Sequence, residues 1–181
     1  MSRFGADLLA RALAAVRSTP APAPAPAAPS QAPHALSAIG VAAALCRRFE
    51  GLHLEPYLDP VGIPTIGYGA TFYEDGRRVT LKDPPITKER AEQLLQWHLR
   101  RHFLPDVAAL CPGADTPNRI GALLDFTFNL GAGNLRSSTL RRKVNAGHWD
   151  EVPAQLMRWN KAGGRVLRGL TRRRQAEIDV L

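Results

Sequence analysis

The sequence predicts an α+β protein in which a small antiparallel sheet is set apart from a group of helices. One observation is the order of patterns along the chain: a helical stretch comes first, then a region of closely spaced turns, then several helical stretches. A second is the composition of residues 54–81, where Gly, Pro and Asp recur around short β-favouring pieces. Strands that are followed by a run of helices are typical of segregated sheets, so we expect two lobes.

Two segments precede the predicted domain. Residues 1–18 place leucines on one arc and arginines largely opposite, which could form a basic amphipathic helix on a membrane surface. The alternative is a disordered or weakly helical arm, which the shortness of the segment favours. Residues 19–34 are rich in Pro and Ala and predict a semi-rigid linker. The compact domain is therefore expected over residues 35–181.

The elements of this domain follow from periodicity and end signals. A first helix is expected over residues 35–51, because Gly51 is a residue that commonly follows a helix. A second is expected over residues 87–104, where Thr87 can act as the N-cap. Between them, short strands of an antiparallel sheet are expected at Tyr57–Leu58, Thr65–Tyr68 and Arg78–Leu81. Further helices are expected near residues 116–130, 137–146, 150–160 and 169–180.

The net charge of +8 indicates an anionic partner. Nucleic acid, peptidoglycan and the phosphorylated surface of a bacterial membrane all qualify. A nucleic-acid-binding module lacks support, because the chain has no RNP-like strand, no zinc knuckle and no GxxG clamp among basic residues. Cys46 and Cys111 form no CxxC pair, so we expect two reduced, buried thiols rather than a disulfide or a zinc site.

Targeting signals are weak. No apolar run reaches the roughly 18 residues that a membrane-spanning helix needs. Asp7 and Arg11 interrupt the apolar part of residues 4–16, which makes a poor secretory signal. The sequence therefore predicts that the chain stays in the cytoplasm after synthesis and meets any external substrate only after another agent opens the membrane.

Residues 49–71, FEGLHLEPYLDPVGIPTIGYGAT, hold the candidate site. Glu50 follows Phe49 at the expected helix end, while Asp59 and Thr65 lie at the two ends of one turn. Glycoside hydrolysis uses a carboxylic acid together with a second carboxylate, and a partly apolar pocket keeps such an acid protonated near neutral pH. The spacing alone is a weak signal, because Asp, Gly and Pro also serve ordinary turns.

The wider stretch resembles the lysozyme family of bacteriophage endolysins, whose signature is a Glu, eight residues, an Asp, five residues and a Thr. It matches through FEG, YLDP and TIGYG. Later stretches are similar to that family's C-terminal helices: LLDFTFNLGAGNLRSSTL (123–140), RWNKAGGRVLRGL (158–170) and RRRQAE (172–177). The resemblance runs from about residue 36 to the end. It departs from the family at Ala70, where a His is common, and we expect the change to affect local stability more than activity.

The resemblance implies a lysozyme-like fold with a cleft between the two lobes. It implies hydrolysis of the β-1,4 bond from N-acetylmuramic acid to N-acetylglucosamine in bacterial peptidoglycan by a monomer, without a metal or other cofactor, causing lysis of the host cell. Glu50 would be the proton donor, and Asp59 and Thr65 would hold the attacking water, which gives inversion. Phe128 and Thr139 match cleft positions more loosely, and Phe128 also fits as a core aromatic.

Two further points stay open at this stage. The family places one arginine of residues 172–174 beside the catalytic acid, whereas the pattern by itself favours a solvated basic face. The alternatives to an enzyme are a catalytically silent wall-binding protein and the nucleic-acid-binding module. The intact Glu50, Asp59 and Thr65 argue against the first of these, and the missing motifs argue against the second.

Overall fold

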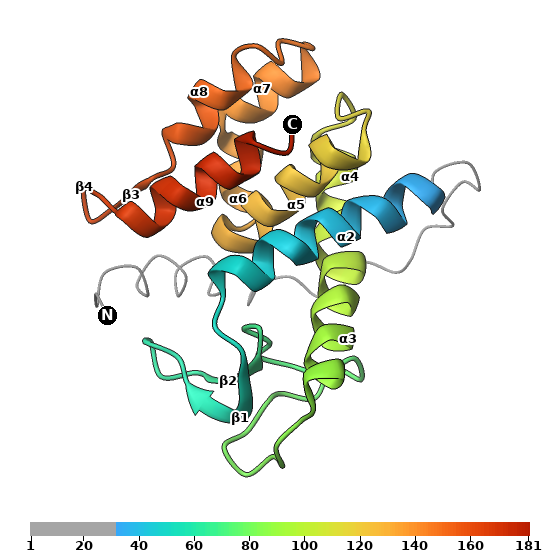
Figure 1. The fold of residues 1–181 in the computed structure, drawn as a ribbon, viewed down its shortest axis with the longest axis vertical. Helices are drawn as coiled ribbons and strands as arrows, with labels where there is room; N and C mark the ends of the chain where they lie inside the picture. Colours follow the sequence, from blue (N-terminus) through green and yellow to red (C-terminus); the bar gives the residue numbers. More distant parts are fainter. Residues whose placement is uncertain (1–31) are drawn as a thin grey trace.

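A helical lobe and a smaller lobe with a two-stranded sheet make up the described part of the chain, residues 32–181 of a computed structural model (Figure 1). The predicted arm, residues 1–18, and most of the predicted linker lie outside the described residues. The elements in chain order are α2 (Ala32–Phe49), β1 (His53–Leu58), β2 (Pro64–Gly67), α3 (Lys88–His98), the π-helical turn η3 (Leu99–Phe103), α4 (Leu104–Leu110), α5 (Pro117–Leu130), α6 (Ala132–Ser137), α7 (Thr139–Asn145), α8 (Val152–Met157), β3 (Lys161–Ala162), β4 (Arg165–Val166) and α9 (Arg168–Ile178).

The sheet of the smaller lobe is antiparallel, as predicted, but has only two strands in the described residues. Tyr57 of β1 pairs with Thr65 of β2. The predicted third strand near Arg78–Leu81 is wrong, because Arg78 makes only an isolated bridge with Phe72. The physical reason is that a side chain takes a backbone group that a strand would need. The carboxylate of Asp83 accepts a hydrogen bond from the backbone N–H of Thr80 at 3.1 Å, so this N–H is not available for pairing in a sheet.

Most predicted helices are present, with corrected limits. Thr87 caps α3 as predicted, since its hydroxyl accepts from the N–H of Arg90 at 3.1 Å. The helix expected near residues 137–146 is present as α7. It begins two residues later than expected, because Ser138 caps it by accepting from the N–H of Arg141 at 3.0 Å. The stretch between the helices expected near residues 150–160 and 169–180 contains the β3–β4 hairpin. Gly163 and Gly164 make its turn possible with φ of +55° and +76°.

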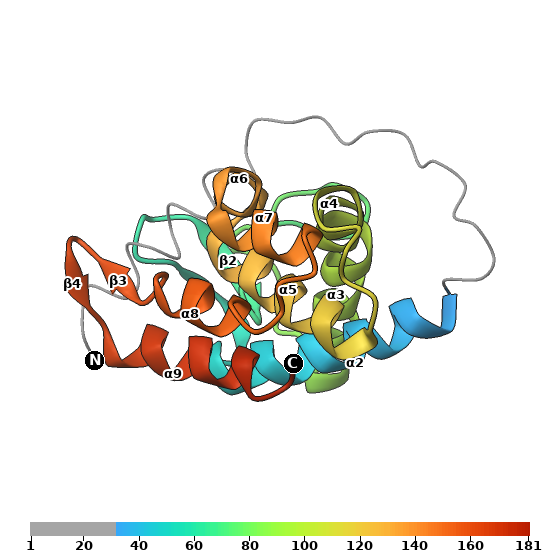
Figure 2. The same ribbon diagram turned by 90° about the horizontal axis from the view of Figure 1, so that it is seen from above.

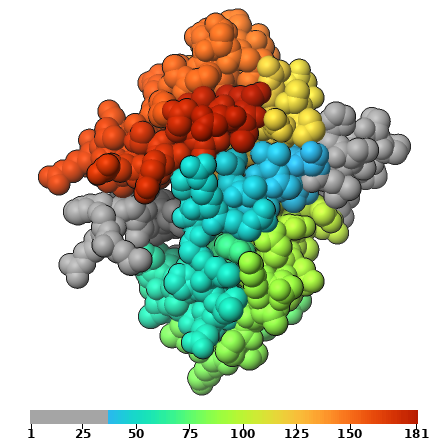
Figure 3. Space-filling model, in the orientation of Figure 1, coloured from blue at the N-terminus to red at the C-terminus, as the bar shows by residue number. Residues whose placement is uncertain are grey.

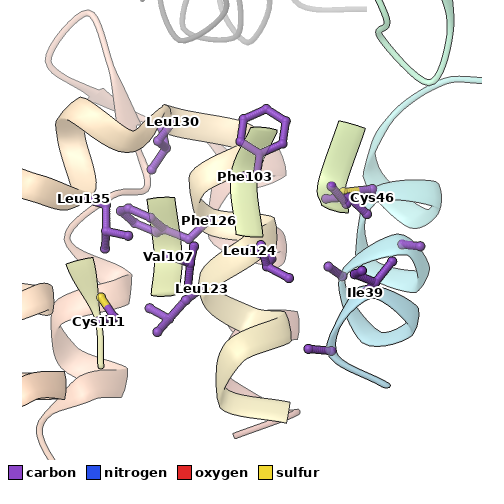
Figure 4. Packing of buried hydrophobic residues seen from close by; sticks show 14 of the residues in the cluster. Ile39, Cys46, Phe103, Val107, Cys111, Leu123, Leu124, Phe126, Leu130 and Leu135 are labelled. Atoms are coloured by element: carbon purple, nitrogen blue, oxygen red, sulfur yellow. The ribbon is translucent and has the colours of Figure 1, made fainter. Parts of the chain in front are cut away.

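Helix α5 lies in the middle of the helical lobe and packs against α2, α4, α6, α9 and η3 (Figure 2). Its apolar residues Leu123, Leu124 and Phe126 are fully buried in the core (Figure 4). Helices α2 and α5 approach closely at Gly121, where an added Cβ would lie 2.6 Å from the Cβ of Val41. This contact holds α2, which leads into Glu50, at a fixed position along α5.

The expectations for the two cysteines and for membrane-spanning helices can also be compared with the structure. Cys46 and Cys111 are free and buried, as predicted. Within residues 32–181, no helix combines the length and the apolar character needed to cross a membrane.

Candidate active site

Glu50 lies directly after the end of α2, where the chain leaves the helical lobe for the sheet (Figure 1). Its backbone N–H donates to the carbonyl of Cys46 at 2.8 Å, so the last turn of the helix orients it. The side chain is only 8% exposed. Arg173 of α9 donates from Nη1 to its Oε1 at 2.5 Å. Residue 50 is thus a nearly buried carboxyl group held from one side by a guanidinium.

Arg173 is itself held by Asp125 of α5. Its Nε donates to Oδ2 at 2.9 Å and its Nη2 to Oδ1 at 2.7 Å, a two-pronged contact that is fully buried. The thiol of Cys46 donates to the same Oδ1 at 3.3 Å. Burial would lower the pKa of Arg173, but the charges of Asp125 and Glu50 raise it well above its usual value. Helices α2, α5 and α9 therefore meet at one charged contact beside Glu50.

The expectation that residues 172–174 form a solvated basic face is correct only for Arg172, which is exposed. Arg173 and Arg174 are buried, and Arg173 is the arginine that contacts Glu50. The sequence spacing could have indicated the burial of Arg173 and Arg174. They follow the apolar Leu170 by three and four positions, and residues so spaced share one face of a helix. Asp125 was missed as a site residue because nothing in its local sequence distinguishes it.

Asp59 and Thr65 are brought together by the β1–β2 hairpin. Asp59 Oδ1 accepts from the N–H groups of Val61 at 3.0 Å and Ile63 at 2.8 Å. The carbonyl of Ile63 accepts both from the N–H of Asp59 at 2.9 Å and from the hydroxyl of Thr65 at 3.0 Å. The two side chains therefore converge on one residue of the turn. Asp59 Oδ2 is buried and has no hydrogen-bond partner within the described residues.

Tyr57 of β1 lies near both carboxyl groups. Burial raises its pKa, and the negative charges of Glu50 and Asp59 raise it further. Its ring stacks on His53 with the ring centroids 4.0 Å apart. Tyr57 was not predicted as a site residue, although its place between Glu50 and Asp59 in the sequence pattern could have suggested it.

Phe128 of α5 lines a cavity of about 30 Å³ between the helices and the turn that follows β2. Its ring packs against Phe103 with the centroids 5.3 Å apart, and the guanidinium of Arg173 lies 6.0 Å from its ring centroid. Thr139 begins α7, where its hydroxyl accepts from Arg142 at 2.7 Å. Thr139 is not among the residues that line this cavity.

Ala70, which stands where the family often has a His, lines the same cavity and is buried. Two histidines of the α3–η3 segment, His98 and His102, line it as well. His98 Nε2 lies 3.0 Å from the carbonyl of Phe72. Burial and, to a smaller extent, the neighbouring His102 together lower the pKa of His98 to about 4, so His98 is neutral near pH 7.

The chain is similar in sequence to known bacteriophage proteins. The phage lysozyme family matches residues 47–177. The SAR-endolysin of Bacteriophage PS119 is 37% identical over 134 residues, which are 72% of this chain and 75% of that protein. The endolysin of Bacillus phage B103 is 34% identical over 133 residues, 74% of this chain, but the match spans only 49% of that longer protein.

A solved structure shares the fold. The endolysin from the Escherichia coli O157:H7 phage FAHEc1 superposes with a TM-score of 0.69 at 33% identity, over 77% of this chain and 89% of that one. The predicted α+β, lysozyme-like fold is confirmed. Since the family match covers most of the chain and includes the hairpin, Glu50 and Arg173, the protein belongs to the phage lysozyme family and is a lysozyme, a muramidase that acts on bacterial peptidoglycan.

Proposed function

We propose that this lysozyme cleaves the β-1,4 bond from N-acetylmuramic acid to N-acetylglucosamine with inversion, using Glu50 as general acid and a water held by Asp59 and Thr65. The observation that carries the proposal is the convergence of Asp59 and Thr65 on Ile63. It leaves one oxygen of each side chain able to accept a hydrogen bond from the same water.

Glu50 suits the acid role because it is nearly buried and uses one oxygen for Arg173. The guanidinium donates to Oε1, which leaves Oε2 to carry the proton toward the substrate. In an inverting hydrolysis the acid gives this proton to the glycosidic oxygen while the bond to the anomeric carbon breaks. The Arg173 contact fixes Oε1 of Glu50, so Asp125, which holds Arg173, also helps to orient the proposed acid.

The hydrogen-bonding roles at the hairpin favour a water over a direct attack by Asp59. The Thr65 hydroxyl gives its own proton to Ile63, so toward a water it can only accept. Asp59 Oδ1 is occupied by two backbone N–H groups, which leaves Oδ2 as the second acceptor. A water that donates to both atoms keeps a lone pair for the anomeric carbon. As it attacks, its proton passes to Asp59, and the product is the α anomer.

The proposed sugar-binding residues are Phe128 and Thr139. Phe128 is supported by its place in the cavity wall and by its closeness to Arg173, which itself holds Glu50. A half-buried aromatic ring in such a wall can stack on the apolar face of a sugar. Thr139 is proposed on the family resemblance alone.

The proposed biological role is that of an endolysin, in line with the names of the relatives. The protein would be made in the host cytoplasm, act as a monomer, and reach the wall after another agent opens the membrane. Residues 1–18, if helical, would contact an anionic outer-membrane surface by their basic face.

The stereochemistry of the fresh product tests the mechanism. Proton NMR during hydrolysis of a soluble wall oligosaccharide should show the α anomer first, and early appearance of the β anomer would contradict the water-holding role of Asp59 and Thr65. Glu50→Gln should abolish turnover. Glu55→Gln is the matched control, because Glu55 is an exposed carboxylate on β1, and it should leave turnover unchanged.

A further inference from the structure

Helix α9 carries a second buried pair of charged groups directly after Arg173. Arg174 Nη2 donates to Glu177 Oε1 at 2.6 Å, and both of these side chains are completely buried. The same nitrogen donates to the side-chain oxygen of Asn129 of α5 at 3.0 Å. The proposed chemistry uses neither Arg174 nor Glu177. Taking two charges out of water is costly, so this pair in the core needs a physical explanation.

The hydrogen bonds of Glu177 distinguish it from the other completely buried carboxyl group, Asp125. Asp125 accepts two hydrogen bonds from Arg173 and one from the thiol of Cys46. Glu177 accepts one from Arg174, and its Oε2 is buried without a donor in the described residues. Hydrogen bonds to a carboxylate favour its ionised form, whereas burial disfavours that form. Asp125 is therefore the better stabilised anion, and Glu177 is the better site for a proton.

The two carboxyl groups also lie next to each other. Glu177 and Asp125 are within hydrogen-bonding reach, and a hydrogen bond between two carboxyl groups needs a proton on one of them. Two ionised carboxylates in contact inside the core would repel each other with little screening by water. Since Asp125 is the better stabilised anion, the proton belongs on Glu177, and the hydrogen bond runs from Glu177 to Asp125.

The pKa directions of the two groups agree with this assignment. Burial raises the pKa of Glu177 well above its usual value; the charge of Arg174 opposes this, and Asp125 adds to it by its charge and its hydrogen bond. Burial also acts to raise the pKa of Asp125, but the charge and hydrogen bonds of Arg173 outweigh it and leave that pKa below its usual value. The environment thus separates the two pKa values in opposite directions.

The other groups around α9 supply no alternative partner for this proton. Helices α2, α5 and α8 pack against α9. Helix α8 contains no titratable residue. Helix α2 contributes the thiol of Cys46, which is neutral because burial raises its pKa well above its usual value, and Glu50 at its end contacts Arg173. On α9 itself, the charged groups that act on Glu177 are Arg173 and Arg174.

We propose that Glu177 is a neutral carboxylic acid that donates a hydrogen bond to Asp125 and thereby helps to position Arg173 against Glu50. Glu177 is a positioning residue, because it acts through Asp125 and touches neither the substrate nor the reacting atoms. Its proton removes one charge from the core and adds a donor to those that Arg173 and Cys46 already direct at Asp125. The orienting of Glu50 rests on the proposed function, whereas the protonated state of Glu177 does not.

Carbon NMR of the wild type tests the proton directly. At pH 7 the side-chain carboxyl carbon of Glu177 should have the chemical shift of a carboxylic acid, and its resonance is assigned by its absence from Glu177→Gln. The exposed Glu55 provides the matched signal of a carboxylate. An ionised Glu177 at pH 7 would overturn the proposal, and this result does not depend on whether any other variant folds.

The pH dependence of the free energy of unfolding provides a second test, measured by urea denaturation between pH 4 and pH 8. Glu177→Gln keeps a donor for Asp125 and an acceptor for Arg174 but cannot ionise. An unfolded Glu titrates near pH 4.3 and folded Glu177 at higher pH, so the wild type should lose stability relative to this variant as the pH rises above about 4.3. The loss is about tenfold in the folding equilibrium constant for each pH unit, until the raised pKa is passed.

Glu55→Gln is the control for this measurement, because it removes an exposed carboxylate of the same residue type and should run parallel to the wild type. A difference between the wild type and Glu177→Gln that stays constant at every pH would contradict the proposal.

Turnover separates positioning from a purely structural role. On a soluble wall oligosaccharide, Glu177→Gln should keep kcat close to that of the wild type. Glu177→Met has a similar length but no donor for Asp125, and it should lower kcat by about tenfold or more with KM little changed, since Arg173 is held less firmly. A folded Met variant with the kcat of the wild type would overturn the positioning role. An active Glu50→Gln would instead overturn the proposed function and leave the NMR and stability results in place.

Discussion

The hydroxyl of Thr65 shows how neighbouring groups limit the hydrogen bonds that one atom can make. It donates its proton to the carbonyl of Ile63, so only its lone pairs are left for the proposed water. Thr65→Val keeps the size and β-branching but removes this acceptor. We expect kcat to fall by about a hundredfold, the lower range for a lost contribution to proton transfer. Thr65→Ser keeps the hydroxyl and should recover most of the rate, measured on a soluble wall oligosaccharide. A Val variant as active as the Ser variant would remove Thr65 from the water site.

The residues of the site differ in how far the sequence could predict them. Glu50, Asp59 and Thr65 lie within one short stretch, where the motif and the turn chemistry are both local. Asp125 and Arg173 could not be assigned, because the Arg173–Glu50 contact joins residues 123 positions apart and the Arg173–Asp125 contact joins residues 48 apart. Such pairs depend on how α2, α5 and α9 pack, and a single sequence does not state that packing.

At the scale of elements, the packing of α2 on α5 sets the distance between Glu50 and its partners. Gly121→Ala would place a Cβ 2.6 Å from the Cβ of Val41 and 3.0 Å from the backbone carbonyl oxygen of Ala38, both on α2. We expect a loss of about 1–3 kcal/mol in the free energy of unfolding, measured by urea denaturation. Gly133→Ala in α6 is the matched control, because no atom lies within 4 Å of its added Cβ. Equal stability of the two variants would show that α2 and α5 do not need the close approach.

The α3–η3 segment should make the fold sensitive to acid through His98. Its pKa of about 4 in the folded state lies below that of an unfolded histidine, about 6.5, so folding favours the neutral form. The stabilisation is present above about pH 6.5 and is lost as the pH falls toward 4, by up to about 3 kcal/mol. His98→Gln should show a weaker fall in the free energy of unfolding over this range. His148→Gln, at an exposed site, should behave like the wild type. The same fall in all three proteins would exclude His98 as the cause.

Long elements were predicted better than short ones, and the reason is physical. Helices such as α3 and α5 repeat their apolar period several times and begin at a capping Thr. The two-residue strands β3 and β4 are too short to show a periodic pattern, and α6 has only six residues between Gly131 and Ser138. Elements of this length form because the rest of the fold holds their ends.

At the scale of the whole molecule, every proposed catalytic group lies within residues 50–173. Deleting residues 1–31 should therefore leave turnover on isolated peptidoglycan within about tenfold of the full chain, about 1.4 kcal/mol in barrier. The measurement is the initial rate of turbidity loss of purified walls. A larger loss would show that these residues belong to the active domain. A contribution to outer-membrane contact would appear only with intact cells.

The net charge of +8 should affect encounter with the wall more than the chemistry. Exposed cations gather on the segment from β3 to α9, which runs across one face of the helical lobe (Figure 3): Lys161, Arg165, Arg168 and Arg172. Attraction between exposed charges is screened beyond about 8 Å at physiological salt. Activity on intact, anionic walls should therefore fall as salt is raised, while activity on a short soluble oligosaccharide should hardly change.

Two double variants distinguish the effect of the exposed cations on the β3–α9 segment from the effect of the total net charge. Arg165→Gln combined with Arg168→Gln should weaken the salt dependence on walls and lower the rate at low salt, because the lost charges lie on that face. Arg100→Gln combined with Arg101→Gln is the matched control. It removes the same number of exposed charges from a different element, the η3 turn. If steering depends on the face, only the first pair changes the salt dependence of the rate. An equal effect of both pairs would mean that total charge alone draws the enzyme to the wall.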